Sequence, residues 1–241
     1  MRGLQAGYLK AKTTAEIYQA LKDDILSLKL RPGQLVSENE VAKLYHVSRT
    51  PVKNAFIRLE GEGLIEVVPQ KGTFVTLIDC KHIYDVVYMR YVLEVKMFGK
   101  LLHSPSFDKI IGKMEENLSA QEEMIRSGTP SPSSFSELDI SFHKLAFEDA
   151  GREHIWSIIK ASEVHYPRLR LLETHITTHY DLLRNQHIGI LEALRARDMP
   201  LLSERIYSHL LQYLSVLTDA SSDKYQSYLL NWQNLLDNAD Y

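Results

Sequence analysis

The segment VSRTPVK, residues 47–53, carries the strongest signal in the chain, because a helix start and exposed basic side chains coincide there. Ser48 is a residue type that caps helix N-termini, and Pro51 is tolerated because it falls within the first helical turn. We therefore expect a helix over about residues 49–60. Its buried stripe is made by Val52, Ala55, Phe56 and Leu59.

Three polar side chains of this expected helix, Arg49, Thr50 and Lys53, lie on or near its exposed side. The fork of an arginine matches the O6 and N7 acceptors of guanine, whereas threonine and a helix N-terminus suit phosphate groups. Three such residues also occur on an ordinary solvated helix face, so the segment alone leaves both interpretations open.

Two further helices precede this segment. Residues 14–28 place apolar side chains at helical spacing after a threonine cap at Thr13 or Thr14, and Arg31-Pro32-Gly33 ends that pattern. Ser37 and Glu40 have the spacing of a capping box. The short helix that follows should turn Val41, Ala42 and Leu44 inward and end near Tyr45-His46.

Two β-rich runs follow the segment, residues 64–68 and 73–77, with Pro69-Gln70-Lys71-Gly72 between them. This pattern predicts a hairpin with Lys71 and Gly72 at its tip, within reach of a sugar-phosphate backbone. Three helices followed by a hairpin is the element order of a winged helix-turn-helix, so we expect a DNA-binding domain over residues 1–78.

This region resembles the N-terminal domain of the GntR family of bacterial regulators. The resemblance implies operator binding as a homodimer on palindromic double-stranded DNA, with each recognition helix in a major groove. Asn39 and Lys53 depart from the family pattern, and a lysine cannot reproduce a bidentate guanine contact. The matching segments are LRPGQL (30–35), SENEVA (37–42), VSRTPVK (47–53), LEGEGLI (59–65) and KGTFV (71–75). The expected DNA-contacting residues are Ser37, Asn39, Ser48, Arg49, Thr50, Lys53, Lys71 and Gly72.

From residue 79 onward the pattern is helical, so the fold class expected is mainly α, with an all-helical C-terminal bundle of six or seven helices. We expect one domain over residues 79–219 and a tail over 220–241. The tail has apolar residues at helical spacing over 222–238, which predicts an extra helix. The expected bundle helices are 79–103, 106–127, 134–150, 152–172, 177–197 and 200–218.

Candidate metal ligands gather in three of these helices. Asp139 and His143 stand four residues apart on an amphipathic helix, so they project from one face, and a divalent ion is one partner for buried groups of this kind. His187 and His209 stand among apolar residues on later helices. Each histidine alone is more often a hydrogen-bonded core residue, and His175 with His179 forms a competing pair near a loop.

Residues 80–218 resemble the FCD ligand-binding domain. The matching segments are DISFH (139–143), HIGILEAL (187–194, less closely) and YMRYVLE (88–94). The resemblance implies that Asp139, His143, His187 and His209 hold one divalent metal ion, and such N/O ligands suit Zn, Ni or Mn. It also implies that Arg90 clamps the carboxylate of a small organic acid, although a salt bridge to Glu94 at i+4 explains the same arginine.

Charge and composition fit such a regulator. The chain has a net charge of −3, but its first 77 residues carry 11 Lys and Arg against 8 Asp and Glu, and the rest carries 17 against 23. A basic N-terminal third suits phosphate, although so small an imbalance also arises by chance. Cys80 is the single cysteine, which excludes an intrachain disulfide. No apolar run of membrane-spanning length and no signal-peptide core occur, so we expect a cytoplasmic protein without membrane partners.

The expected function is therefore sequence-specific transcription regulation, as a repressor whose operator binding responds to a small acid at a metal site. Three alternatives stand beside it: a metal-dependent enzyme acting on a small acid, a regulator with a purely structural metal, and an architectural DNA binder without an effector. The metal motif offers no obvious general base, which argues against the enzyme.

Overall fold

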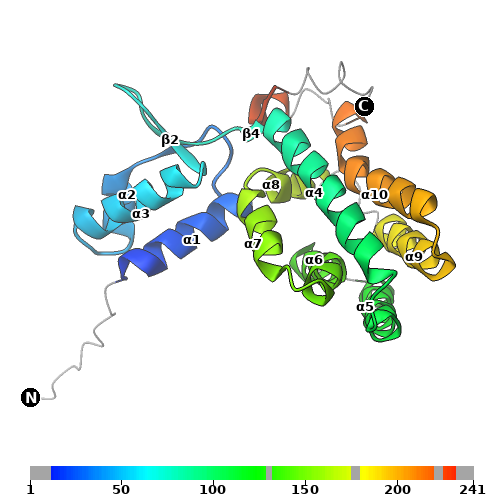
Figure 1. Ribbon diagram of the computed structural model, residues 1–241. Coiled ribbons are helices and arrows are strands. Elements are labelled where there is room, and N and C mark those ends of the chain that lie inside the picture. The colour runs from blue at the N-terminus through cyan, green and yellow to red at the C-terminus, as the bar shows by residue number, and fades with distance from the viewer. Residues whose placement is uncertain (1–11, 129–131, 175–179, 220–224, 232–241) are drawn as a thin grey trace, which may run out of the picture. The chain divides into compact units, whose positions relative to one another are not determined.

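The computed structural model describes residues 12–128, 132–174, 180–219 and 225–231 of the chain (Figure 1). The chain divides into two compact units, the first ending at Ile78 and the second beginning at Asp79. The first unit holds helices and a small sheet, and the second is almost entirely helical. This is the mainly helical fold class that the sequence predicts, with a winged helix-turn-helix before a helical domain.

Helix α1, Thr14–Leu26, opens the first unit. Thr13 is its N-cap, one of the two threonines that the sequence predicted for this role. The hydroxyl of Thr13 accepts from the amide of Glu16, and the Glu16 carboxylate accepts from the amide of Thr13 at 2.7 Å. This reciprocal pair satisfies two amides that have no partner within the helix. The apolar stripe is buried as expected, with Ile17, Leu21 and Ile25 each less than 5% exposed.

Helices α2, Glu38–Leu44, and α3, Arg49–Gly61, begin after Ser37 and Ser48 as expected, but neither serine side chain makes a capping hydrogen bond. The predicted capping box at Ser37 is therefore wrong. Acidic side chains in the first turn of α2 interact favourably with its N-terminal dipole without such a bond. The inward placement of Leu44 is also wrong, because this last residue of a two-turn helix is 68% exposed.

The predicted hairpin forms from β2, Ile65–Val68, and β3, Gly72–Val75, in antiparallel register with Val68 opposite Gly72. A third strand that the sequence pattern missed, β1 at Leu35–Val36, pairs with the other side of β3. Two residues are too few to show an alternating pattern, which explains the omission. The sheet order is β1-β3-β2, so the wing is anchored on both sides of its central strand.

The second unit is a bundle around α4. Helix α4 packs against α6, α7 and α10, while α5 packs against α6 and α9. Figure 1 shows α4 running through the middle of the bundle, with α9 and α10 on one side and α6 and α7 on the other. The helices are α4 Cys80–Leu101, α5 Phe107–Arg126, α6 Pro132–Asp149, α7 Glu153–Ser162, α8 Tyr166–Thr174, α9 Tyr180–Ala196 and α10 Met199–Asp219.

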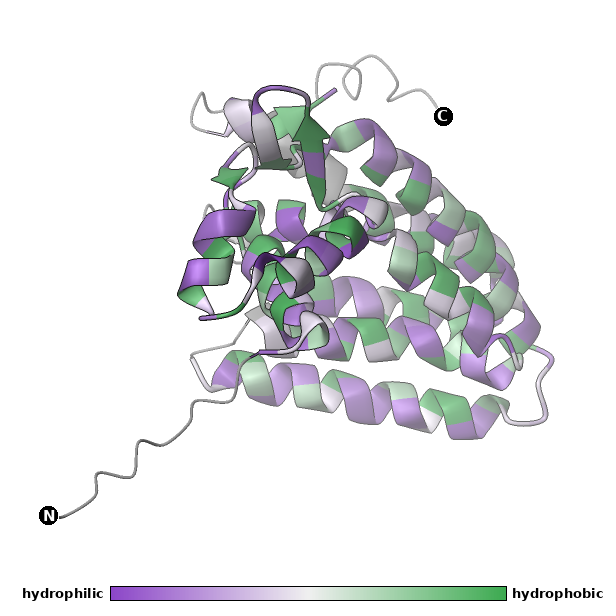
Figure 2. Cartoon of the chain, turned by 90° about the vertical axis from the view of Figure 1, so that its left-hand side faces the viewer, coloured by the Kyte–Doolittle hydropathy of each residue, from purple (hydrophilic) through white to green (hydrophobic). Residues whose placement is uncertain are grey.

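Along most of these helices, polar and apolar residues follow one another at short intervals, visible as purple and green segments in Figure 2, so each helix has an apolar face. Burial of the apolar face provides most of the stabilisation of such helices. The core is rich in aromatic side chains, since Phe98, Phe135, Phe142 and Phe147 are completely buried. In the part of the chain that the structure describes, no helix is long and apolar enough to cross a membrane.

The single helix predicted over residues 152–172 is two helices, α7 and α8, separated at Glu163–His165. Pro167 explains the break. Its ring would clash with the carbonyl of Glu163 in a continuous helix. Pro167 is instead accommodated in the first turn of α8, where the missing amide hydrogen costs little.

The helix predicted over residues 222–238 is wrong where the structure describes the tail, and residues 222–224 and 232–238 lie outside the described residues. Residues 226–228 form a 3₁₀ turn, and β5, Leu229–Leu230, pairs with β4, Ile78–Asp79. The side chain of Asn231 donates to Asp79 Oδ1 at 3.1 Å. Pairing with a distant strand has overridden the local helical pattern.

Candidate metal centre and DNA-reading surface

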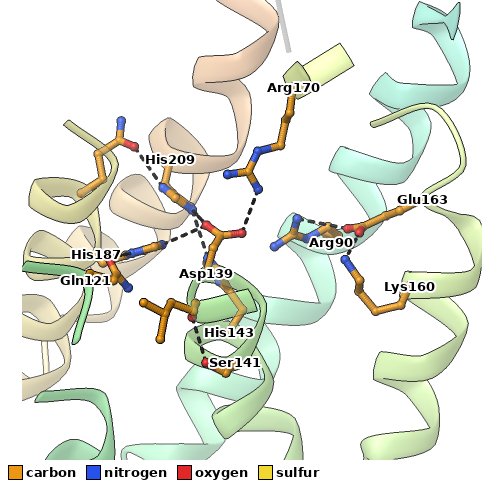
Figure 3. A network of polar contacts seen from close by, with 12 residues as sticks. Arg90, Gln121, Asp139, Ser141, His143, Lys160, Glu163, Arg170, His187 and His209 are labelled. Atoms are coloured by element: carbon orange, nitrogen blue, oxygen red, sulfur yellow. Dashed lines mark hydrogen bonds and ion pairs between the residues drawn. The ribbon is translucent and has the colours of Figure 1, made fainter. Parts of the chain in front are cut away.

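Three helices of the second unit bring the four predicted ligands together. Asp139 and His143 come from α6, His187 from α9 and His209 from α10, and all four side chains are almost fully buried (Figure 3). One ligand atom from each residue lies within 4.8 Å of the others. The competing pair, His175 and His179, lies outside the described residues.

The imidazole nitrogens that face the centre are the three Nε2 atoms. Nε2 of His143 and Nε2 of His209 are 3.0 Å apart. Asp139 Oδ1 lies 3.4 Å from Nε2 of His187 and 3.8 Å from Nε2 of His209. Asp139 Oδ1 and His187 Nε2 are buried without a protein hydrogen-bond partner. The four inward atoms are therefore close together and directed at one another.

An outer ring of acceptors faces the other nitrogen of each imidazole. Gln121 Oε1 lies 3.0 Å from Nδ1 of His187, and Gln186 Oε1 lies 3.0 Å from Nδ1 of His209. The orientation of the Gln121 amide is fixed, because its nitrogen donates to Asn117 at 2.7 Å. A carboxylate oxygen of Glu94, Oε2, lies 2.7 Å from Nδ1 of His143.

These outer partners decide the protonation of the histidines. Nδ1 of His187 and Nδ1 of His209 each face an amide oxygen and so carry the hydrogen, which leaves a lone pair on their Nε2 atoms. Burial lowers the pKa of His187 and, more strongly, that of His209, which favours their neutral forms. The three Nε2 atoms then meet Asp139 Oδ1, a buried carboxylate oxygen without a protein hydrogen-bond partner.

Such a set of acceptors is electrostatically unfavourable on its own, and a divalent cation resolves it. Imidazole and carboxylate are ligands that Zn, Ni and Mn all accept, so the residues present fit a metal ion. Cys80 does not belong to the set, because it is buried elsewhere in α4 and burial raises the pKa of its thiol to about 12.

Asp139 has a second partner that sequence reasoning missed. Arg170 of α8 donates from Nη1 to Asp139 Oδ2 at 3.1 Å. Burial alone would raise the pKa of Asp139, but Arg170 and the neighbouring histidines hold it well below its usual range. The signal that could have indicated Arg170 is its spacing: it stands four residues after Tyr166, so the two side chains lie on the same face of the helix, and Tyr166 is buried.

Arg90, the predicted effector clamp, donates from Nε to Glu94 Oε1 at 2.8 Å and from Nη1 to Glu163 Oε1 at 3.1 Å. The salt bridge at i+4 that the sequence left open is thus present. Burial would raise the pKa of Glu94, but Arg90 and His143 lower it to about 2. Gln121 was also missed, although it is a polar residue within an otherwise apolar stripe of α5, and so was the contact of Glu94 with His143.

The predicted DNA-reading residues lie together on the first unit. Asn39, Ser48, Arg49, Thr50 and Lys53 are exposed on α2, α3 and the turn between them. Arg49 lines a hollow with Asn39 and His46, and its guanidinium lies 3.0 Å from Glu38, an ion pair that water screens. Ser37 is partly buried at the start of α2.

The tip of the wing carries the other two predicted residues. Lys71 is exposed, and Gly72 has a φ of +127°, which disfavours any residue with a side chain. A Cβ at Gly72 would also lie 2.7 Å from Cδ1 of Leu35 in β1, but that side chain is 55% exposed and can turn aside, so the backbone φ is the stronger constraint. Gly72 therefore shapes the wing, whatever it contacts.

Comparisons with known proteins agree with this architecture. Residues 13–75 match the model of the bacterial regulatory proteins of the gntR family, and residues 85–212 match that of the FCD domain. The HTH-type transcriptional repressor RspR of Escherichia coli K12 is 30% identical over 195 residues, which cover 81% of this chain and 84% of that protein.

A second relative, an HTH-type transcriptional regulator from an unstable DNA locus of Streptomyces ambofaciens, is 32% identical over 199 residues and covers 81% of this chain and 80% of its own. The solved structure of E. coli McbR/YncC superimposes with a TM-score of 0.62 at 18% identity, covering 86% of this chain and 97% of that one. The last likeness concerns the fold alone. This chain belongs to the GntR family of bacterial regulatory proteins, with an FCD domain at its C-terminal side, and it is a DNA-binding transcription regulator rather than an enzyme.

Proposed function

We propose that the protein binds a palindromic operator as a homodimer and represses transcription, and that a small carboxylate bound at the metal centre changes its operator affinity. The observation that carries the sensor half is the buried set of acceptors made by Asp139, His143, His187 and His209. Burying these acceptors together without a compensating positive charge costs folding free energy, so the set supports a bound cation with a function.

The four residues would hold one divalent ion, Zn, Ni or Mn, which supplies a Lewis-acid site for a carboxylate oxygen. The chain's own contribution is orientation. Gln121, Gln186 and Glu94 lie against the outer nitrogens of the three imidazoles and so hold Nε2 inward, and loss of such a partner typically lowers metal affinity about 10- to 100-fold. The predicted role of Arg90 as the effector clamp stays a prediction.

For DNA, we assign the base contact to Arg49 and phosphate contacts to Thr50, Lys53 and Ser48 around the N-terminus of α3. Ser37, which precedes α2, and Asn39 of α2 would flank the same groove, and Lys71 with Gly72 would approach the adjacent backbone. A homodimer presents two such helices, which a palindrome matches by symmetry. That the relative RspR is named a repressor supports repression over activation.

Coupling between the two units requires that the acid bind one conformation of the dimer better than another. The acid would lie beside the ion within the bundle, and repacking of the helices around it would alter the spacing of the two recognition helices. A coupling of about 1–3 kcal/mol, typical of such effects, would change operator affinity about 5- to 150-fold.

Selection of binding sites from a random double-stranded DNA pool, followed by titration of the selected site with a panel of small acids, tests this proposal. We expect a palindromic consensus, one divalent ion per chain by elemental analysis, and at least one acid that shifts operator affinity. A metal-loaded protein whose operator affinity no acid alters would make the metal purely structural. Binding without a consensus would point to an architectural role.

A further inference from the structure

A groove between α4 and α10 lies apart from the metal centre. The two helices pack side by side, and the groove between them has a volume of about 370 Å³ (Figure 1). Its described lining consists of four tyrosines, two aliphatic side chains, a serine and a glutamate. None of these is a metal ligand or one of the outer partners described above, so the groove is a separate feature of the bundle.

The tyrosines form an aromatic wall that contacts between the two helices hold in place. On α4, Tyr84, Tyr88 and Tyr91 stand four and three residues apart, so they share one face of the helix. Tyr207 of α10 meets the ring of Tyr91 edge-on, with 5.3 Å between the ring centroids. The hydroxyl oxygens of Tyr91 and Ser203 lie 2.8 Å apart. Because the face of a tyrosine ring is negative, such a wall attracts cations.

Glu204 of α10 adds a full negative charge to this lining. It is exposed, and within the described residues it takes part in no ion pair and no hydrogen bond. No lysine, arginine or histidine is among the described residues that line the groove. A carboxylate and tyrosine rings without a basic neighbour are complementary in charge to a cation that carries apolar groups.

A second copy of the chain is another occupant to weigh for an apolar groove. In a two-fold dimer the same surface patch of both copies forms the interface. A groove packed against itself would bring two Glu204 carboxylates toward each other, and like charges brought together at an interface are unfavourable. The charge of the groove therefore favours a small cation over self-association.

We propose that the groove between α4 and α10 binds a small organic cation, with its ammonium group against the tyrosine rings and Glu204 and its apolar part on Val87 and Leu211. Quaternary ammonium ions and protonated amines share this chemistry. The volume lies within the range of about 300–1,000 Å³ usual for ligand pockets, near its lower end, which suits a molecule with one ring or a short chain. This inference goes beyond the proposed acid-sensing function and does not depend on it.

The test uses full-length protein loaded with Zn²⁺ and measures affinity by ligand-observed NMR titration. Benzyltrimethylammonium is the quaternary probe and benzylammonium is the protonated amine. Benzyl methyl sulfone, which is similar in size but uncharged, is the control ligand. We expect both cations to bind about 2- to 30-fold more tightly than the sulfone, which is the range of a cation–π contact.

The main variant is Tyr88→Leu, which removes an aromatic ring but keeps an apolar side chain. Tyr88 is 58% exposed, so the thermal midpoint should stay near that of the wild type. Benzyltrimethylammonium binding should weaken about 2- to 30-fold in Tyr88→Leu, and Tyr88→Phe, which retains the ring, should recover most of it. Glu204→Gln should weaken it up to about fivefold, because the carboxylate is exposed. Glu192→Gln, at an exposed residue of α9, is the matched control and should change nothing.

Three results would overturn the proposal. Equal affinity for the cations and the sulfone would make the groove an apolar surface without selectivity for charge. Unchanged cation affinity in both Tyr88→Leu and Glu204→Gln would place the bound cation elsewhere on the protein. Dissociation of a dimer into monomers in Tyr88→Leu, measured by analytical ultracentrifugation, would identify the groove as an interface between two copies of the chain.

Discussion

The two units of this regulator place their functional side chains in opposite settings. The expected DNA-reading residue Arg49 is 68% exposed on the side chain, and its one ion pair, with Glu38, stands in water. The metal centre is built from side chains that are 5% exposed or less, including Asp139 and His143. Exposed DNA-contacting residues can be substituted without disturbing the fold, whereas substitution of a buried ligand also requires changes in the side chains packed around it.

The strongest test of this contrast removes two ligands at once. Asp139→Ala combined with His143→Ala should abolish stable metal binding, because the variant loses two of the four ligands, both of them on α6. Elemental analysis of purified protein checks this directly. The fold should also lose the stabilisation that a bound ion provides, about 2.7 kcal/mol at a metal concentration a hundred times the Kd.

A matched control for the double variant is His154→Ala, which removes an exposed histidine of α7 in the same unit. It should leave metal content and thermal midpoint unchanged. Full metal occupancy of the double variant would show that the ligand assignment is wrong. The double variant should still bind the operator, because none of the four described metal ligands lies in the first unit.

A smaller but still large effect is expected at the outer ring. Glu94→Gln leaves an oxygen for His143 but turns an amide donor toward Arg90, so a buried ion pair becomes a contact between two donors. Breaking a buried pair in this way typically costs about 3–5 kcal/mol, and losing an outer partner lowers metal affinity about 10- to 100-fold. Chemical denaturation and chelator competition measure the two effects.

The control for Glu94 is Glu115→Gln. Glu115 pairs with Arg195, but the two side chains are 43% and 55% exposed, and exposed pairs contribute about 0–1 kcal/mol. If the two glutamate variants lose equal stability, the contrast between buried and exposed ion pairs that we draw for this protein does not hold.

On the exposed side, Arg49→Ala should reduce affinity for the selected operator by about 1–3 kcal/mol and relax the preference at one base position. Lys53→Ala should weaken binding to all sequences by a similar factor, with a flatter dependence on salt. Neither should change the thermal midpoint, since both residues are exposed. Fluorescence anisotropy with operator and scrambled duplexes separates the two roles. Loss of base preference in Lys53→Ala alone would reverse the assignment.

Local patterns predicted one unit better than the other, for physical reasons. In the first unit the caps, turns and apolar stripes are neighbours in sequence, so the winged helix was predictable apart from strand β1, the capping box at Ser37 and the placement of Leu44. In the second unit the i, i+4 spacing made Asp139 and His143 candidates beside His175 and His179. The family resemblance then selected Asp139 and His143, together with His187 and His209. Arg170 and Gln121 were missed, because their partners Asp139 and His187 are 31 and 66 residues away.

The two fold errors have different causes, one local and one long-range. Pro167 could be recognised from sequence as a helix breaker, and its neglect merged α7 with α8. The pairing of β5 with β4 joins residues about 150 positions apart, as the bond from Asn231 to Asp79 shows. No periodicity within the tail encodes such a partner, since only the folded bundle brings β4 beside it.

The smallest expected effect concerns pH and the first unit. Glu62 accepts from Lys22 Nζ at 2.6 Å and from the hydroxyl of Tyr18. Burial would raise the pKa of Glu62, but these two partners lower it below its ordinary value of 4.5. Stability from a carboxyl of this kind is fully present above pH 4.5 and is lost as the pH falls through the lower folded pKa.

Glu62→Gln should therefore flatten the acid dependence of the thermal midpoint. The effect should be modest, because the Glu62 side chain is 36% exposed. The control variant Glu60→Gln, at an exposed residue of α3, should leave that dependence unchanged. A pH profile equally steep in Glu62→Gln would mean that the Lys22–Glu62 ion pair contributes nothing measurable, and would sharpen the contrast with the buried network around Glu94.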